Sequence, residues 1–426
     1  MKQNIINVVD APCGSGKTSW AIKSMNEASV ETHKFIYVTP FLNEVSRVTE
    51  SVVKREFYAP IVSKDGRTKL EHLHELLKDG KDICTTHSLF HMANKETRQL
   101  LKDHNYTLIL DEVLNVIEQI PLKMHDIDLL LAAKAISVED VNGIEYVKWN
   151  DKIKHYDTEY NKVRNMALSG NLLYFDKNAL IWNFPCDIFS CFKDVYLLTY
   201  LFKGQIQRYY YDLHNTKYRF LSVSKEGGEY TLVPYDERVI HDKTKLRSLI
   251  KIYEGNLNDI GDKPYSLSST WLKKNKQVDQ LKKNAYNYFT NKLKANKDNA
   301  LWTTYKASVD KVKPRNFASA FLSVNSRATN EYKERYNLAY LVDRYMTPIE
   351  KRFFKHYGVN VDESTWALSE LIQWVWRSRI RQEQEINIYI PSKRMRNLLQ
   401  SYLVSDDFET APKGAITKQY ASDWNF

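Results

Sequence analysis

The sequence predicts an α/β fold in which two parallel-sheet domains stand in tandem around a cleft. Short apolar segments alternate with helix-like segments over the first 110 residues, which is typical of a parallel sheet covered by helices. A glycine-rich loop at 11–18 lies between the first apolar segment and the first helix. After a polar stretch at 254–266 the alternation begins again, which indicates a second domain with the same rhythm.

The expected domain limits follow from these breaks in the pattern. Residues 1–118 and 190–255 are expected to form the first domain, and residues 119–189 interrupt it as an insertion with helix-like and hairpin-like segments. Residues 256–266, rich in Gly, Asp and Pro, are the expected linker. Residues 267–426 are expected to form the second domain.

The secondary structure of the first domain is read from the spacing of its apolar residues. Helices are expected at 17–29 and 42–56, where apolar residues recur at helical spacing. The expected strands lie in the apolar segments 4–10, 34–40, 82–90 and 106–113, and the α/β alternation returns at 193–212.

The composition is basic and aromatic, with 62 Lys+Arg against 52 Asp+Glu and with 28 Tyr, 17 Phe and 9 Trp. Such a surface suits single-stranded nucleic acid, whose phosphates attract cations and whose bases stack, although many basic proteins bind none. The insertion contains Tyr174, Phe175 and Trp182. These rings fit either a strand-separating wedge or base-stacking platform, or the core of a small subdomain.

The compartment is inferred from what the sequence lacks. No apolar run approaches the roughly 20 residues that span a bilayer, and the segment after Lys2 has no apolar region of signal-peptide length. The four cysteines, Cys13, Cys84, Cys186 and Cys191, are scattered without metal-ligand spacing. We therefore expect a reduced, cytoplasmic protein with no membrane partner.

The loop between the first strand and the first helix has the chemistry of a phosphate site. Backbone N–H groups at a helix N-terminus bind anions, Lys17 can reach the outer phosphates, and Thr18 can hold Mg²⁺ through its hydroxyl. Ala11 replaces the first glycine of the usual pattern. Phosphate contacts are expected from Pro12, Cys13, Gly14, Ser15, Gly16, Lys17, Thr18 and Ser19.

A second acidic element follows the apolar strand in "YTLILDEV", residues 106–113. Ligands of open α/β sheets bind at the carboxyl ends of strands, where Asp111 would complete the Mg²⁺ shell. Glu112 would orient and deprotonate the attacking water. A metabolic kinase would need an acceptor pocket, and a guanine-specific GTPase an Asn-Lys-x-Asp element; the sequence shows no signature of either.

Cationic side chains recur near the C-terminus in "ELIQWVWRSRIRQEQ". Gln373, Arg377 and Arg381 are spaced four residues apart, as on one stripe of a helix. Arginines that project into an interdomain cleft neutralise the charge of a phosphoryl-transfer transition state. A basic helix face without a catalytic role is the alternative reading.

Taken in order, these elements resemble a superfamily 2 DNA or RNA helicase or translocase, in the compact form of phages and mobile elements. "APCGSGKT" is similar to motif I, in which Ala commonly opens the loop, and "DEVL" at 111–114 stands where the DEAD or DEAH box belongs. The adenine-reading glutamine motif of the family is missing before the loop. Looser resemblances to motifs Ia, Ib, III, IV and V lie at 38–45, 85–90, 197–202, 266–270 and 325–332.

"QWVWRSRIR" at 373–381 resembles motif VI, with two departures from the pattern of the family. Trp376 stands in place of the usual glycine, and Ile380 stands in place of the second arginine. Either Arg379 or Arg381 would have to act instead, and the helical spacing from Arg377 favours Arg381.

The resemblance implies two RecA-like domains that bind ATP and Mg²⁺ between them, with nucleic acid lying across both. Arg377 and Arg381 would act with Gln373 on the γ-phosphate, and Thr199 would couple the two sites. Motif by motif, the resemblance assigns the nucleic-acid contacts to Thr39, Pro40, Thr85, Thr86, His87, Ser268, Ser269, Thr329 and Asn330.

The resulting hypothesis is an ATP-dependent helicase or translocase that acts on single-stranded or forked DNA rather than RNA, with replication proteins as candidate partners and an open oligomeric state. A packaging-type ATPase of phage replication usually adds a nuclease with clustered acidic ligands, and Asp406, Asp407 and Glu409 are sparse by comparison. A nucleotide-dependent loader or scaffold is the third reading. Glu112 argues against it, because a pure switch gains nothing from a general base.

Overall fold

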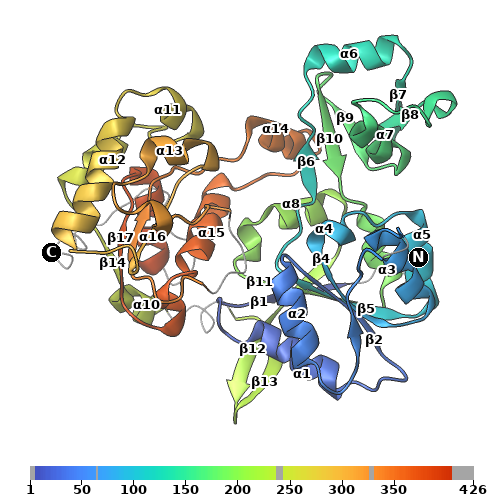
Figure 1. Ribbon diagram of the computed structural model, residues 1–426, viewed down its shortest axis with the longest axis horizontal. Helices are drawn as coiled ribbons and strands as arrows, with labels where there is room; N and C mark the ends of the chain where they lie inside the picture. Colours follow the sequence, from blue (N-terminus) through green and yellow to red (C-terminus); the bar gives the residue numbers. More distant parts are fainter. Residues whose placement is uncertain (1–4, 64–65, 237–242, 326–330, 405–426) are drawn as a thin grey trace.

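A computed structural model describes residues 5–63, 66–236, 243–325 and 331–404. Its largest element is an eight-stranded sheet of order β13-β12-β1-β11-β5-β2-β4-β3, seen at the lower right of Figure 1. Neighbouring strands are parallel except in the β12–β13 hairpin. The strands are β1 (Ile6–Asp10), β2 (Lys34–Thr39), β3 (Phe57–Tyr58), β4 (Asp82–Thr86), β5 (Tyr106–Asp111), β11 (Asp194–Thr199), β12 (Tyr218–Glu226) and β13 (Glu229–Pro234).

Helices cover both faces of this sheet, so its central strands are apolar on both sides. In β2, Ile36 and Val38 belong to one buried cluster, whereas Phe35 and Tyr37 belong to another on the opposite face. The covering helices are α1 (Lys17–Glu27), α2 (Leu42–Ser51), α3 (Lys69–Lys78), α4 (His87–Phe90), α5 (Lys95–Asp103) and α8 (Ile206–Leu213).

A second, four-stranded parallel sheet lies in the C-terminal half, in the order β14-β17-β16-β15. In the described part of the chain, no helix combines the length and the apolarity that a bilayer-spanning segment needs. The strands are β14 (Ile250–Ile252), β15 (Ala300–Thr303), β16 (Asn337–Tyr340) and β17 (Ile386–Tyr389). The helices are α10 (Lys243–Leu249), α11 (Ser269–Lys274), α12 (Val278–Asn287), α13 (Val309–Val312), α14 (Pro348–His356), α15 (Glu363–Val375) and α16 (Lys393–Val404).

The chain passes to the second sheet earlier than the sequence predicts. β14 pairs in parallel with β17, so residues 250–252 belong to the second sheet and not to the first domain. The expected linker at 256–266 follows this strand and contains the 3-10 helix η4 (Asn256–Gly261). Gly, Asp and Pro mark turns inside a domain as well as connections between domains, and a three-residue strand is too short to show an apolar rhythm.

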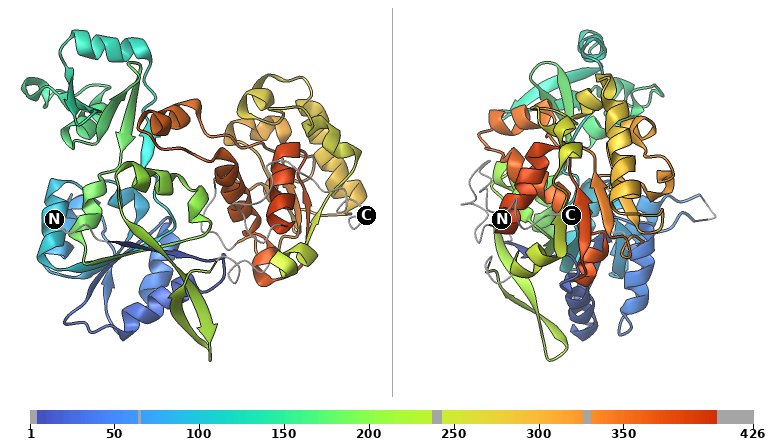
Figure 2. Two further views of the ribbon diagram at one scale, coloured as in Figure 1. Left: turned by 180° about the vertical axis from the view of Figure 1, so that it is seen from behind. Right: turned by 90° about the vertical axis from the view of Figure 1, so that its left-hand side faces the viewer.

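The insertion has an antiparallel sheet of order β6-β10-β9-β8-β7. Phe175 and Trp182 are buried, at 3% and 7% exposure, so these two rings serve the core of a small subdomain rather than an exposed wedge. Figure 2 shows this unit standing clear of the first sheet. Its elements are β6 (Ile117–Gln119), α6 (Met124–Ala132), β7 (Ile136–Val141), β8 (Ile144–Trp149), α7 (Asn161–Leu168), β9 (Leu172–Phe175) and β10 (Ala179–Asn183).

The insertion touches the C-terminal half of the chain through α14. Arg352 Nη1 lies 2.6 Å from Asp176 Oδ2 in the β9–β10 turn. Beside this ion pair, the Phe175 ring meets the Phe353 ring edge-on, with 5.4 Å between the centroids. Two segments far apart in the sequence are therefore joined beside the cleft.

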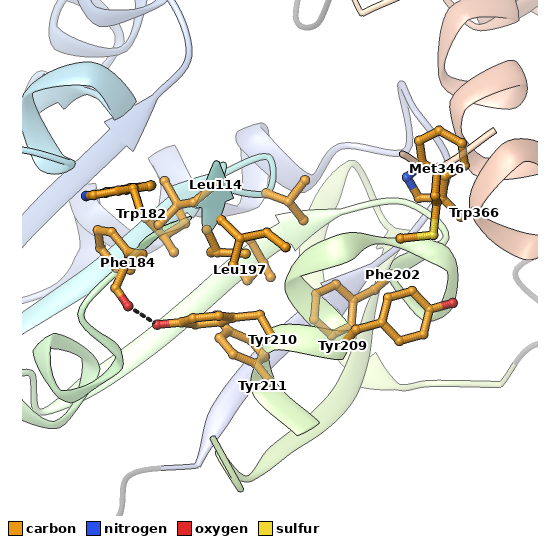
Figure 3. Packing of buried hydrophobic residues seen from close by; sticks show 14 of the residues in the cluster. Leu114, Trp182, Phe184, Leu197, Phe202, Tyr209, Tyr210, Tyr211, Met346 and Trp366 are labelled. Atoms are coloured by element: carbon orange, nitrogen blue, oxygen red, sulfur yellow. Dashed lines mark hydrogen bonds between the residues drawn. The ribbon is translucent and has the colours of Figure 1, made fainter. Parts of the chain in front are cut away.

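The two parallel-sheet domains meet where η3 (Phe202–Gly204) packs on α15. A β-carbon on Gly204 would lie 2.5 Å from the carbonyl oxygen of Thr365, so only glycine allows this approach. Figure 3 shows Phe202 on one side of the joint, with Met346 and Trp366 opposite it. All three side chains are buried.

The same joint is tied to the strand that precedes the phosphate loop. The carboxylate of Asp10 accepts hydrogen bonds from the N–H groups of Leu201 and Phe202, each at 2.8 Å. Asp10 is the last residue of β1, directly before the phosphate loop. The start of the loop and the interdomain joint are therefore both attached to this one residue.

Two half-buried histidines predict that acid destabilises the junction of the insertion and the first sheet. The His91 ring lies 5.3 Å from that of Trp182, and the His214 ring lies 4.5 Å from that of Tyr210. Burial lowers the pKa of each from 6.5 to about 4. The unfolded chain therefore binds protons that the folded chain does not, and the stabilisation present above pH 6.5 declines as the pH falls.

We expect a loss of about 1 kcal/mol per histidine between pH 7.5 and pH 5.5, seen as a lower Tm. His91→Phe should reduce the pH dependence of Tm, whereas the exposed His125→Gln should leave it as in the wild type. Equal pH dependence in all three proteins would contradict the assignment.

Candidate active site

The loop expected to bind phosphate runs from β1 into α1 and curls around its own lysine. Gly14 and Gly16 have φ values of +89° and +97°, a region that glycine enters without strain. Lys17 Nζ donates to the carbonyl oxygens of Ala11 and Pro12 at 2.5 and 3.0 Å. Ala11 is not among the residues with positive φ, so this turn does not need a glycine at its first position.

The loop offers groups that suit an anion. Ser15 Oγ is buried without a hydrogen-bond partner in the described part of the chain. Thr18 and Ser19 lie in the first turn of α1, whose free N–H groups carry partial positive charge. Pro12 and Cys13 complete the partly buried rim. Charged phosphate oxygens are the natural acceptors for such a set of donors.

Asp111 ends β5, two strands away from β1 in the sheet, and Glu112 follows it. Burial, and after it the neighbouring charge of Glu112, raises the pKa of Asp111 from 3.8 to about 7. Glu112 has a φ of +70°, an uncommon conformation for a residue with a side chain. Its N–H donates to the carbonyl oxygen of Leu198 at 2.9 Å, which fixes this backbone.

Arg377, from the second domain, lies beside the Glu112 carboxylate of the first domain. Its guanidinium Nη2 lies 3.8 Å from Glu112 Oε1, and the Arg377 side chain is only 4% exposed. Arg377 Nε and Nη2, with Glu112 Oε2, have no hydrogen-bond partner among the described residues. A buried cation and a buried carboxylate with unused donors and acceptors thus face each other between the two domains, an arrangement that costs free energy unless further groups bind there.

The predicted helical stripe of Gln373, Arg377 and Arg381 is wrong. α15 ends at Val375, where the Ser378 hydroxyl donates to the Val375 carbonyl oxygen at 2.6 Å, and a separate 3-10 helix, η8 (Arg379–Gln382), follows. Spacing alone does not reveal where a helix ends. Arg377 therefore lies in a turn between two helices.

The three residues have different neighbours. Gln373 donates to the Tyr200 carbonyl oxygen at 3.3 Å and so contacts the loop after β11. Arg381 lies beside the phosphate loop: a β-carbon on Gly14 would be 3.5 Å from its carbonyl oxygen. Arg379 instead donates to the Glu385 carbonyl oxygen at 3.1 and 2.6 Å, which keeps it in its own domain.

The hydroxyl residues expected to contact nucleic acid stand at strand ends of the first sheet. Thr39 and Thr85 are buried at the ends of β2 and β4, and Pro40 follows Thr39. Thr86 caps α4 by accepting from the Leu89 N–H at 3.4 Å. His87 Nε2 donates to the Asp111 carbonyl oxygen at 3.0 Å and so links β4 to the acidic pair.

The expected contacts of the second domain are only partly described. Ser268 caps α11 by accepting from the Trp271 N–H at 3.3 Å, and Ser269 begins this helix. Thr329 and Asn330 lie outside the described residues.

Thr199 stands between the phosphate loop and the interdomain joint. Its carbonyl oxygen accepts the Ala11 N–H at 3.1 Å, and its hydroxyl accepts from Gln205 Nε2 at 3.0 Å. Gln205 in turn donates to the Tyr200 carbonyl oxygen, which Gln373 also contacts. Thr199, the residue expected to couple the nucleotide and nucleic-acid sites, is thus connected to the phosphate loop and to the interdomain joint.

A cavity of about 1630 Å³ opens between the two domains and α14. Ser268, Ser269 and Gln373 line it. Most of the aromatic and basic residues that line it were not predicted from the sequence. The mixture of aromatic and basic residues in "EKRFFKH" could have indicated part of this lining. These lining residues are Tyr265, Trp271, Tyr345, Lys351, Arg352 and Lys355.

The architecture is that of tandem RecA-like helicases. A solved chain named XPD helicase superposes with a TM-score of 0.50 and 14% identity, covering 93% of this chain and 95% of that one. The structure of Xpd4 from S. tokodaii gives a TM-score of 0.51 at 10% identity, covering 94% of each chain. The chain therefore shares the tandem RecA-like fold of these solved structures.

Its own family is defined by sequence. The SPbeta prophage-derived uncharacterized protein YonV of Bacillus subtilis (strain 168) is 43% identical over 410 residues, covering 93% of this chain and 98% of the relative. Residues 117–182 match the YonV middle domain, and residues 244–403 match the YonV C-terminal Rossmann-like domain. The chain belongs to the YonV family.

Proposed function

We propose that this protein is a nucleic-acid-dependent ATPase that translocates along or unwinds DNA, and RNA less readily. The observation that carries the proposal is the approach of Arg377 to Glu112 at 3.8 Å, next to the phosphate loop. A cation from one domain and a carboxylate from the other would then act on one γ-phosphate. Binding of the triphosphate would favour the closed pair of domains, and hydrolysis would remove that preference.

Each residue of the candidate active site has a proposed role. The loop from Pro12 to Ser19 would hold the phosphates, with Lys17 turned from its carbonyl partners toward the anion. Thr18 and Asp111 would hold Mg²⁺, which when bound neutralises phosphate charge. The raised pKa of Asp111 supports this role, because a cation removes the cost of its buried negative charge.

The remaining residues would act on the water and the leaving charge. Glu112 would orient and deprotonate the attacking water. Arg377 and Arg381 would stabilise the charge of the transition state. Gln373 would link domain closure to the loop after β11 through its hydrogen bond to the Tyr200 carbonyl oxygen.

The nucleic acid is proposed to lie across the strand ends of the first sheet and along the cavity between the domains. Exposed Tyr265 and partly exposed Trp271 and Tyr345 line that cavity with Lys351 and Lys355, which suits stacked bases and their phosphates. Such contacts do not depend on base sequence. Because the relative is prophage-derived, we propose mobile-element DNA as the substrate, with replication proteins as candidate partners.

The direct test measures ATP turnover with single-stranded DNA, duplex DNA, forked DNA and RNA, followed by strand displacement on the strongest activator. We expect single-stranded or forked DNA to stimulate turnover, and Lys17→Ala to reduce it by at least about 100-fold by removing phosphate contacts made in the transition state. Lys54→Ala, which removes an exposed lysine of the same domain, is the control.

Two results would contradict the proposal. Turnover that no nucleic acid alters would exclude a nucleic-acid motor. Tight ATP binding with negligible turnover and a stable protein partner would favour the loader or scaffold instead.

A further inference from the structure

The β12–β13 hairpin extends the first sheet beyond the strand that carries the phosphate loop. β12 pairs in parallel with β1, and β13 forms the sheet edge beyond it. The hairpin is fastened to α1, because Lys23 Nζ lies 2.6 Å from Glu229 Oε2. Figure 1 shows the hairpin running beside α1. The β12–β13 hairpin thus forms one edge of the candidate nucleotide site.

Tyr230 of this hairpin lies directly on the phosphate loop. A β-carbon on Gly16 would overlap the Tyr230 ring, so the loop and the ring are in contact and only glycine fits there. The ring is partly exposed, and its hydroxyl makes no hydrogen bond within the described residues. Lys225 Nζ lies 5.4 Å from the ring centroid. Packing against Gly16 and the nearby Lys225 cation hold this aromatic surface beside the candidate phosphate loop.

The strand order tells which end of a nucleotide would meet Tyr230. β1 carries the loop, β5 with Glu112 lies on one side of it, and β12–β13 lies on the other. A triphosphate whose γ-phosphate points toward Glu112 and Arg377 therefore has its nucleoside end pointing toward the hairpin. Tyr230 is the aromatic side chain that touches the loop on that side.

We propose that Tyr230 is the stacking surface for the base or ribose of the bound nucleoside triphosphate. The inference rests on the proposed function, since it assumes that the triphosphate lies in the loop. Every base has a π-face, so stacking accepts all of them. The hairpin segments Tyr218–Glu226 and Glu229–Pro234 contain no Asn or Gln, the amides that pair with the edge of an adenine. The site consequently takes nucleoside triphosphates with little preference for the base.

The test compares Tyr230→Ala and Tyr230→Phe with the wild type. Measured quantities are kcat and KM for ATP and GTP and the inhibition constant of inorganic triphosphate, which has no base. Tyr230→Ala should raise both KM values about ten-fold, with kcat and the inhibition constant within about two-fold of the wild type. Tyr230→Phe keeps the ring and should behave as the wild type. Tyr156→Ala removes an exposed tyrosine of the insertion and is the matched control.

Other outcomes overturn the inference in recognisable ways. A lower KM or faster turnover in Tyr230→Ala would mean that the ring obstructs the site. An equal loss for inorganic triphosphate would mean that Tyr230 only supports the shape of the loop. Acceptance of ATP with rejection of GTP would require a base-edge reader.

Failure of the proposed function itself gives a different pattern. In that case the wild type shows no turnover, and neither ATP nor inorganic triphosphate binds. If turnover alone is missing, the binding constants of ATP and GTP for wild type and Tyr230→Ala still decide the role of Tyr230.

Discussion

Glu112→Gln is expected to lower kcat for ATP by about 1000-fold while ATP binding is retained, because a glutamine cannot accept the proton of the attacking water. The substitution preserves the volume of the side chain at a backbone position that is already unusual, with φ of +70°. The measurement is single-turnover hydrolysis beside equilibrium binding of Mg²⁺–ATP.

Glu118→Gln, on exposed β6 beyond the acidic pair, is the matched control and should hydrolyse ATP like the wild type. A Glu112→Gln protein that retains more than a tenth of wild-type turnover would remove Glu112 from the catalytic role. Loss of binding together with turnover would indicate that Glu112 maintains the shape of the site.

Arg377→Ala is the second substitution with a large expected effect, a fall in kcat of about 1000-fold. The guanidinium is buried against Glu112 and comes from the other domain, so its loss removes transition-state charge stabilisation from one side of the cleft. It also leaves the Glu112 carboxylate buried without its cation, so Tm must be measured alongside kcat.

Arg377→Lys separates these two effects because it keeps a positive charge near Glu112 without the guanidinium geometry. Arg379→Ala is the matched control, since Arg379 faces the Glu385 carbonyl and the Tyr336 ring of its own domain. The assignment of roles would be wrong if Arg379→Ala lost activity and Arg377→Ala kept it.

The α/β fold class and the meeting of the phosphate loop with the acidic pair could be predicted from the sequence. Both depend on local patterns: an apolar strand, a loop with Gly14 and Gly16, and a carboxylate at the end of another apolar strand. Parallel strands present their carboxyl ends at one edge, so local patterns are enough to bring Lys17 and Glu112 into one neighbourhood.

Features that depend on long-range packing could not be read in this way. The spacing of Arg377 and Arg381 predicted one helix, but the chain turns after Val375 and reaches the same cleft by another path. The short β14 belongs to the second sheet because it pairs with β17. Tyr230 lies beside the candidate site because its ring contacts Gly16, 214 positions earlier in the sequence. No window of neighbouring residues contains either relation.

The close approach at Gly204 determines which relative movement of the two domains costs least. Pulling them apart there would expose the buried side chains of Phe202 and Trp366 to water and lose their packing. Turning one domain about the contact with the Thr365 backbone keeps that surface covered. Rotation of one domain about this joint is therefore expected to cost less free energy than separation of the two domains.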